Sequence, residues 1–146
     1  MLTIPDSLEL ANGLRPLLLQ LNRHLLRELA GLRITADQAA LLHVIRSNPG
    51  IGVRALADHE GVSAPAMSGY IDRLEGAGFV ERVRSESDRR RVGLRVTVAG
   101  VRVLRSARSR RTAWLAQRLR RLTDAERAAV QAALEPLGLL LAEETA

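Results

Sequence analysis

The sequence contains no cysteine and no lysine, and it has very few aromatic residues. Without cysteine, disulfides, thiol redox sensing and cysteine-ligated metal sites are excluded. With one Trp, one Tyr and one Phe, the core must consist of Leu, Val, Ile and Ala, which favour helices. No apolar run approaches the roughly 18 residues of a membrane span, and no signal-peptide pattern opens the chain. We therefore expect a cytoplasmic protein of bacterial type.

The sequence also lacks the patterns that mark enzymes. It has no glycine-rich phosphate loop, no nucleophile elbow and no paired carboxylates at catalytic spacing. Its three histidines, His24, His43 and His59, share no metal-ligand spacing. These observations predict a protein without catalytic activity, metal or cofactor.

The positive charge comes entirely from arginine and is concentrated late in the chain. The 146 residues carry 22 Arg against 16 acidic residues, for a net charge of +6. Residues 101–121 contain 8 Arg and no acid, whereas residues 122–146 contain 1 Arg and 5 acids. This excess indicates an anionic partner, and the guanidinium fork suits phosphate and base edges. A genome-wide bias toward arginine codons explains the absence of lysine equally well.

Apolar spacing predicts a mainly helical chain. Leucines recur every three or four residues over 5–29, which is typical of a long amphipathic helix, and Gly31 ends it. Thr35 and Gln38 form a capping box that starts a helix to about Ser47. The segment 97–100 leads into a further helix, which is expected to run to about residue 121. A second capping box at 123–126 starts the last helix, where Pro136 should introduce a kink.

The centre of the sequence predicts a helix-turn-helix followed by a β-hairpin. A short helix over 53–60 is joined by the turn 61–63 to a second helix over 64–76. Ser63 can cap the second helix, and Pro65 is tolerated in its first turn because no intrahelical hydrogen bond is lost there. Strand runs over 79–83 and 92–98 flank a basic tip. The side chains of the second helix expected to point inward are Met67, Tyr70, Ile71 and Leu74.

We expect a single domain over residues 1–146, mainly α with a small β-hairpin wing. Its winged helix-turn-helix spans 35–98, with the recognition helix at 64–76 and the wing at 79–98. The helices over 5–30 and 99–143 are too apolar to lie free, so they are expected to pair with those of a second copy in a two-fold dimer. An intramolecular bundle is the alternative.

These segments together resemble the MarR family of bacterial regulators (multiple antibiotic resistance regulators). The resemblance covers nearly the whole chain and rests on residues 32–38, 53–63 and 72–80. It also rests on the wing pattern D-x-R-x-x-x-[VL]-x-[LV]-T at 88–97, with Gly100 after it. It implies a dimeric DNA-binding repressor or activator, usually relieved by a small aromatic or phenolic ligand. An architectural DNA-binding protein without effector control is the alternative.

The resemblance implies that each recognition helix enters a major groove of a pseudo-palindromic operator in double-stranded DNA. Many members carry a long polar side chain where Gly69 stands, so base readout by this helix is limited. By resemblance, Arg90 enters the minor groove and Asp88 holds it by a charge-assisted hydrogen bond. Arg73 is expected to grip a phosphate or to pair with a nearby acid. The expected DNA-binding residues are Arg54, Ser63, Ala64, Pro65, Ala66, Ser68, Gly69, Arg73, Arg84, Asp88, Arg89, Arg90 and Arg91.

The resemblance also implies an effector pocket between the dimer helices and the winged part. Its candidate residues, of types that more often serve in packing or on the surface, are His24, Arg27, His43, Tyr70, Arg111 and Trp114. The arginines of 101–121 are expected to pair with acids of the last helix, to line this pocket, or to extend the DNA-facing surface. Those acids are Glu126, Glu135, Glu143 and Glu144.

Overall fold

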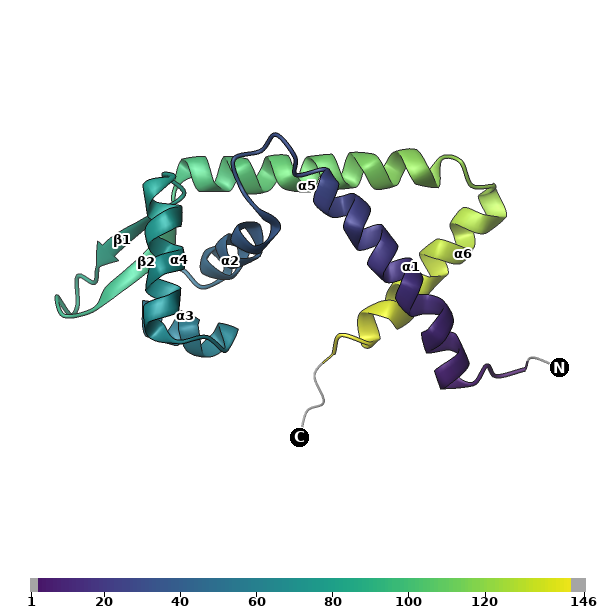
Figure 1. The fold of residues 1–146 in the computed structure, drawn as a ribbon, viewed down its shortest axis with the longest axis horizontal. Helices are drawn as coiled ribbons and strands as arrows, with labels where there is room; N and C mark the ends of the chain where they lie inside the picture. The colour runs from purple at the N-terminus through teal and green to yellow at the C-terminus, as the bar shows by residue number, and fades with distance from the viewer. Residues whose placement is uncertain (1–2, 143–146) are drawn as a thin grey trace. The chain divides into compact units, whose positions relative to one another are not determined.

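The computed structural model describes residues 3–142, so Glu143 and Glu144 lie outside the described residues. The chain divides into two compact units, residues 1–111 and 112–146, which are described separately. Figure 1 shows the elements along the chain. They are α1 (Ser7–Arg27), α2 (Ala36–Ser47), α3 (Val53–Glu60), α4 (Ala64–Gly76), β1 (Val80–Arg84), β2 (Val92–Val96), α5 (Val98–Leu119) and α6 (Asp124–Leu139).

Side-chain caps start three of the helices where the sequence predicted them. The Thr35 hydroxyl accepts from the Gln38 backbone N–H at 3.2 Å, and Gln38 Oε1 accepts from the Thr35 N–H at 3.0 Å. Thr123 and Glu126 make the same reciprocal pair at the start of α6. The Ser63 hydroxyl accepts from the Ala66 N–H at 3.2 Å and caps α4. Each pair satisfies backbone donors that the first helical turn leaves without partners.

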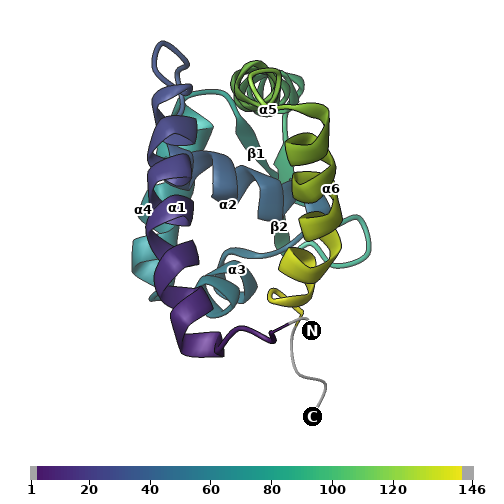
Figure 2. The ribbon, with the colours of Figure 1, turned by 90° about the vertical axis from the view of Figure 1, so that its right-hand side faces the viewer.

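The core of the first unit lies among α2, α3, α4 and the hairpin. Figures 1 and 2 both show these helices grouped beside the two strands. The side chains with no exposed surface include Leu42, Ile45, Leu56, Ile71, Leu74 and Leu94. Tyr70 was predicted to point inward, and this is wrong, because its side chain is 40% exposed. Met67, Ile71 and Leu74 already fill the apolar stripe of α4, so Tyr70 lies at its edge.

The hairpin is antiparallel, with Val80 opposite Val96 and Arg84 opposite Val92. The second strand was predicted to reach residue 98 but ends at Val96. The cause is Thr97, whose hydroxyl donates to the Gly78 carbonyl at 2.6 Å and accepts from the Gly100 N–H at 3.1 Å. This double contact turns the chain out of the strand, and α5 begins at Val98.

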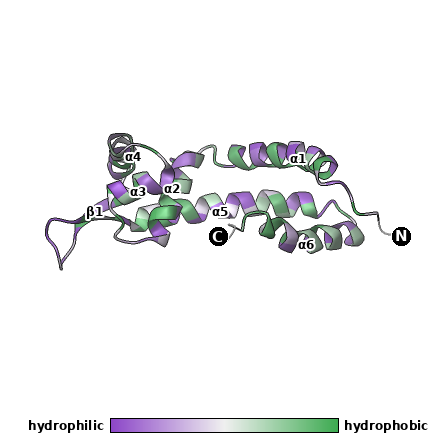
Figure 3. Cartoon of the chain, turned by 90° about the horizontal axis from the view of Figure 1, so that it is seen from below, coloured by the Kyte–Doolittle hydropathy of each residue, from purple (hydrophilic) through white to green (hydrophobic). Residues whose placement is uncertain are grey.

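The first and last helices bury none of their residues. In Figure 3, apolar and polar residues alternate along α1. The large apolar residues exposed on it include Leu8, Leu10, Leu17, Leu18, Leu19, Leu21 and Leu26. The helix α1 ends at Arg27 rather than near residue 29, and α6 ends at Leu139 after passing Pro136. No described helix has both the length and the apolar character needed to cross a bilayer.

Candidate DNA interface

The start of α4 presents a shallow surface. Pro65 is exposed, and Ala64, Ala66, Ser68 and Gly69 are partly exposed. None of these five residues carries a long polar side chain, so Ser68 is the only side-chain hydrogen-bonding group among them. Gly61, with a φ of 68°, closes the turn from α3, which carries the exposed Arg54. This surface can fill a groove but offers little of the bidentate chemistry that distinguishes bases.

The tip of the hairpin is organised by the Asp88 carboxylate. Its Oδ1 accepts from the Arg90 backbone N–H at 3.0 Å, and its Oδ2 lies 3.9 Å from Nε of Arg91. The carboxylate was expected to hold the Arg90 side chain, whereas it holds the Arg90 backbone and pairs with Arg91. Among the described residues, no ion pair or hydrogen bond engages the guanidinium of Arg89 or Arg90. The tip therefore presents two unpartnered cations on an ordered turn.

The hairpin is attached to the rest of the unit by the segment before α3. The Gly50 N–H donates to the Leu94 carbonyl at 2.9 Å, and the Leu94 N–H donates to the Ile51 carbonyl at 2.8 Å. Gly93 permits this approach, since a Cβ there would lie 2.6 Å from the Gly50 carbonyl oxygen. An open depression of about 660 Å³ lies beside this junction, lined in part by Arg84, Arg91 and Arg95.

One residue of the hairpin was missed by the sequence analysis. Arg82 of β1 donates through Nη1 to Glu75 at 2.8 Å and through Nη2 to Asp72 at 2.8 Å. The hydrogen bond with Asp72 is the main reason that the pKa of Arg82 lies above its usual value. Because seven and ten residues separate the partners across a turn, no local spacing in the sequence signals this contact.

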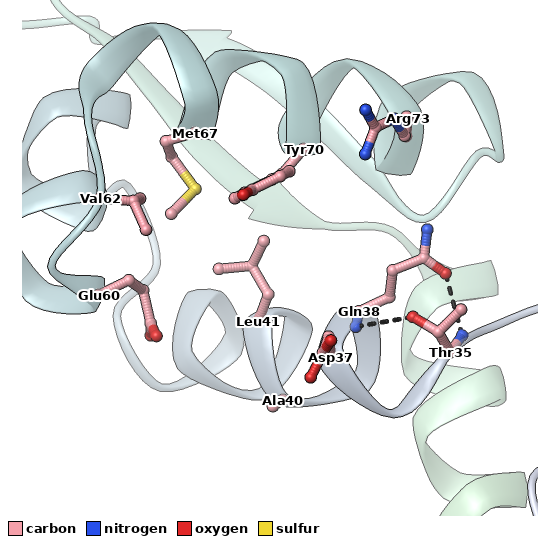
Figure 4. Close-up of a pocket in the computed structure, with 10 residues that line it drawn as sticks. All are labelled: Thr35, Asp37, Gln38, Ala40, Leu41, Glu60, Val62, Met67, Tyr70 and Arg73. Carbon is pink, nitrogen blue, oxygen red and sulfur yellow. Dashed lines mark hydrogen bonds between the residues drawn. The ribbon is translucent and has the colours of Figure 1, made fainter.

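Arg73 does not pair with a nearby acid, which was one of the two roles expected for it from the sequence. Asp72 and Glu75 are engaged by Arg82, and the Arg73 guanidinium instead lies 5.8 Å from the centroid of the Tyr70 ring. Figure 4 shows Tyr70 and Arg73 along a cavity of about 620 Å³ between α2 and α4, opposite the Thr35–Gln38 capping box. Arg73 remains accessible for a phosphate because no acid holds it among the described residues.

Two of the candidate effector residues line one cavity. His43 and Arg111 meet in a cavity of about 570 Å³ between α2 and the first part of α5. Tyr70 lines the cavity of Figure 4 instead, and His24 and Arg27 lie on α1. Trp114 belongs to the second unit, where the Arg118 guanidinium lies 5.1 Å from its ring centroid.

The cavity between α2 and α5 is basic, and one of its cations, Arg46, was not expected from the sequence. It is lined by Ala36, Ala39, Ala40, His43, Arg46, Leu104, Arg105, Ala107, Arg108 and Arg111. No acid is among them, and Nε of Arg111 is buried without a hydrogen-bond partner in the described residues. The one-turn spacings 43/46 and 105/108/111 place these side chains on single helix faces, a signal that the sequence contained.

The ion pairs expected between the arginine-rich segment and the last helix are absent from the described part of the second unit. In the second unit, no ion pair joins Arg118, Arg120 or Arg121 to Glu126 or Glu135 among the described residues. Glu126 is used by the capping box of α6. In the first unit, Arg110 donates to the Ala30 carbonyl at 2.8 Å, which ties α5 to the turn after α1.

A capped recognition helix, packed on a shorter helix and followed by a hairpin with a basic tip, defines a winged helix-turn-helix DNA-binding regulator. The model of the MarR family matches residues 34–92. The chain is 31% identical, over 97% of its length and 99% of the relative, to an uncharacterized HTH-type transcriptional regulator of Mycobacterium bovis. The chain belongs to the MarR family and is a DNA-binding transcriptional regulator.

Further comparisons agree with this assignment. An HTH-type transcriptional repressor of Mycobacterium tuberculosis is 31% identical over 75% of this chain and 79% of the repressor. A putative transcriptional regulator of Pseudomonas aeruginosa superposes with a TM-score of 0.83 at 27% identity, covering 96% of this chain and 100% of that one. Streptococcus pneumoniae FabT, solved in complex with DNA, has the same fold, with a TM-score of 0.69 at 24% identity over 93% of this chain and 97% of FabT. The predicted family and mainly helical winged fold are confirmed, and these relatives are regulators rather than enzymes.

Proposed function

We propose that this regulator is a dimeric repressor that binds a pseudo-palindromic operator and is released by a small aromatic ligand. The observation that carries the proposal is the ordered wing tip, where the guanidiniums of Arg89 and Arg90 have no partner within residues 3–142. It stands beside a recognition helix whose own surface is nearly featureless. A named repressor among the relatives supports the direction of regulation.

The proposed dimer is supported by the apolar surfaces of α1 and α6, on which no residue is fully buried within one chain. Exposed leucines in this number favour association, because contiguous apolar surface of this kind is rare on monomers. A two-fold dimer would present two recognition helices to half-sites about one turn of DNA apart. In this proposal residues 35–98 form the DNA-binding part, and the helices over 5–30 and 99–143 form the dimer.

The proposed contacts divide between the two grooves. The cap Ser63 and positions 64–66, 68 and 69 at the start of α4 would face the major groove, with Arg73 and Arg54 on flanking phosphates. Arg90 would enter the minor groove, held in place through its backbone by Asp88. Arg84, Arg89 and Arg91 would contact the sugar–phosphate backbone, since their side chains are exposed.

The effector is proposed to bind in the basic cavity between α2 and α5. Its alanine and leucine lining suits a flat aromatic body, and the guanidiniums at positions 105, 108 and 111 suit a carboxylate or phenolate. The buried Nε of Arg111 has no partner in the described residues, so a bound anion would satisfy it.

The proposal is tested by footprinting a genomic fragment library, followed by titration of the selected operator with benzoate and hydroxybenzoates. A gated repressor should bind the operator with two chains per duplex, gain thermal stability from one of these acids, and lose the DNA when it binds.

Arg108→Gln should abolish the thermal shift, and Arg102→Gln on the same helix should preserve it. DNA binding that no ligand alters would support the architectural alternative. A lower operator affinity of Arg108→Gln itself would place α5 on the DNA surface.

Arg89→Ala should lower the affinity for operator and for unrelated duplex by the same factor. The reason is that a phosphate contact attracts any sequence, so its loss should also reduce the salt slope by about 1 per contact. Fluorescence anisotropy over a range of salt concentrations measures both quantities. Ser87→Ala, at the same exposed tip, is the control and should change neither. A loss confined to the operator would instead make Arg89 a base-reading residue.

A further inference from the structure

The two elements proposed to enter the DNA grooves are joined by one guanidinium. Arg82 of β1 reaches two carboxylates of α4, Glu75 and Asp72, each at 2.8 Å and each through a separate nitrogen. The side chain of Arg82 is 28% exposed, so it lies mostly covered between the hairpin and the helix. We call these three residues the Arg82 bridge.

The Arg82 bridge has the geometry of a constraint. Asp72 and Glu75 are three residues apart, on one face of α4, and a planar fork that engages both fixes the direction from which the strand approaches. Each partly exposed ion pair stabilises a protein by only about 0–1 kcal/mol, so the two pairs of the bridge contribute modestly to folding. Together with the shared core and the hydrogen bond from the Phe79 N–H to the Leu74 carbonyl, its two contacts restrain the angle between α4 and the hairpin.

The bridge also decides which cations near α4 remain available. Because Arg82 engages both acids, neighbouring Arg73 has no acidic partner among the described residues. Arg82 itself has both terminal nitrogens occupied by carboxylates and lies mostly covered, so it is poorly placed to contact DNA. Arg84, two residues further along β1, is exposed and has no such partner in the described chain.

We propose that Arg82 is a positioning residue that determines specificity, holding the wing and the recognition helix in the one relative orientation in which both reach their grooves. This inference rests on the proposed DNA contacts of both elements. Specific binding requires the two elements to engage neighbouring grooves at once, whereas non-specific binding requires only phosphate contacts. Loss of the bridge therefore lowers specific binding and spares non-specific binding.

The first test compares the operator with an unrelated duplex of equal length. Arg82→Gln should lower operator affinity by about tenfold or more, a loss comparable to a mismatched base pair, and change non-specific affinity by less than about twofold. The salt slope should stay the same. Arg84→Gln is the matched control, because it removes the same charge from the same strand and should weaken both duplexes alike. An equal loss on both duplexes for Arg82→Gln would overturn the proposal by making Arg82 a phosphate contact.

A second variant breaks the bridge from the other side. Asp72→Asn combined with Glu75→Gln retains Arg82 and makes the surface more positive. Electrostatic attraction alone predicts tighter binding to every duplex. Loss of positioning predicts a lower ratio of operator affinity to non-specific affinity, as for Arg82→Gln. A ratio that stays the same or rises would contradict the inference.

A measurement without DNA separates this inference from the proposed function. Since the chain has no cysteine, nitroxide labels attach only at Ser87→Cys and Ser68→Cys, and mixing the labelled protein with an excess of unlabelled protein leaves the distance from wing to recognition helix within one chain as the one that is measured. The distance distribution should be narrow in the otherwise unaltered protein and broaden with Arg82→Gln. An unchanged distribution would overturn the positioning role of Arg82 even if the operator is bound as proposed. Broadening in a protein that shows no operator preference would retain the positioning role and reject the proposed function.

Discussion

Replacing Arg90 with alanine should lower operator affinity much of the way to that for an unrelated duplex, while the chain stays folded and associated. The turn that presents this residue is ordered by its neighbours, since Asp88 accepts from the Arg90 backbone N–H and Ser85 donates its N–H to the Arg91 carbonyl at 2.9 Å. The guanidinium itself holds nothing in place. Its removal should therefore leave the shape of the wing intact.

The effect is expected to be large because α4 contributes so little base readout. A narrow A·T-rich minor groove concentrates negative potential, and an inserted arginine reads that shape. One base-reading arginine contributes about 1–3 kcal/mol, and a two-fold dimer inserts two of them. The combined loss of about 2–6 kcal/mol covers much of the gap of about 4–10 kcal/mol between specific and non-specific binding.

Gel-shift titration with operator and unrelated duplex measures this loss, and light scattering checks association. Arg89→Ala is the control at the adjacent position, with a small loss shared by both duplexes. Unchanged operator affinity of Arg90→Ala would show that the wing tip is not the source of specificity. The selectivity of the protein for its operator would then need another explanation, because the surface of α4 is shallow.

The second large effect is expected on stability, from Gly100→Ala. Gly100 is buried at the start of α5, where an added methyl group would overlap the Phe79 carbonyl oxygen and lie 2.6 Å from Cγ1 of Val96. Moving either the Phe79 backbone or the packed Val96 side chain costs free energy, so α5 would have to move away from the hairpin. That movement also weakens the hydrogen bond that the Gly100 N–H donates to the Thr97 hydroxyl.

Overpacking of this kind costs about 1–3 kcal/mol, and the lost cap adds to it. We expect a decrease in Tm of about 5–10 °C, given roughly 2–4 °C per kcal/mol for a chain of this size. Gly76→Ala is the control, because nothing lies within 4 Å of the added Cβ and alanine favours helix. It should leave Tm unchanged or raise it. Equal effects of the two substitutions in a thermal melt would contradict the packing explanation.

Local patterns in the sequence were sufficient to predict most of the fold. The capping boxes at Thr35 and Thr123 and the cap at Ser63 involve residues three apart, so their geometry follows from the helix itself. The recognition helix over 64–76 and the hairpin after it likewise follow from apolar period and turn residues. The basic tip at 88–91 could be placed for the same reason.

Contacts between distant segments could not be predicted in this way. The partner of Asp88 depended on the conformation of one turn, and the exposure of Tyr70 depended on which α4 side chains the core had room for. The basic cavity required α2 and α5 to come together, although each contributes its cations at ordinary one-turn spacing.

By itself, the sequence determined the helices, the recognition helix, the basic wing and the family, because each is encoded in neighbouring residues. Only the tertiary structure decided that Arg82 joins the wing to α4, that Arg73 has no acidic partner among the described residues, and that Gly100 admits no side chain. The physical reason is common to all three. Each depends on the direction in which one element meets another, and that direction is a property of the packed core rather than of any short stretch of chain.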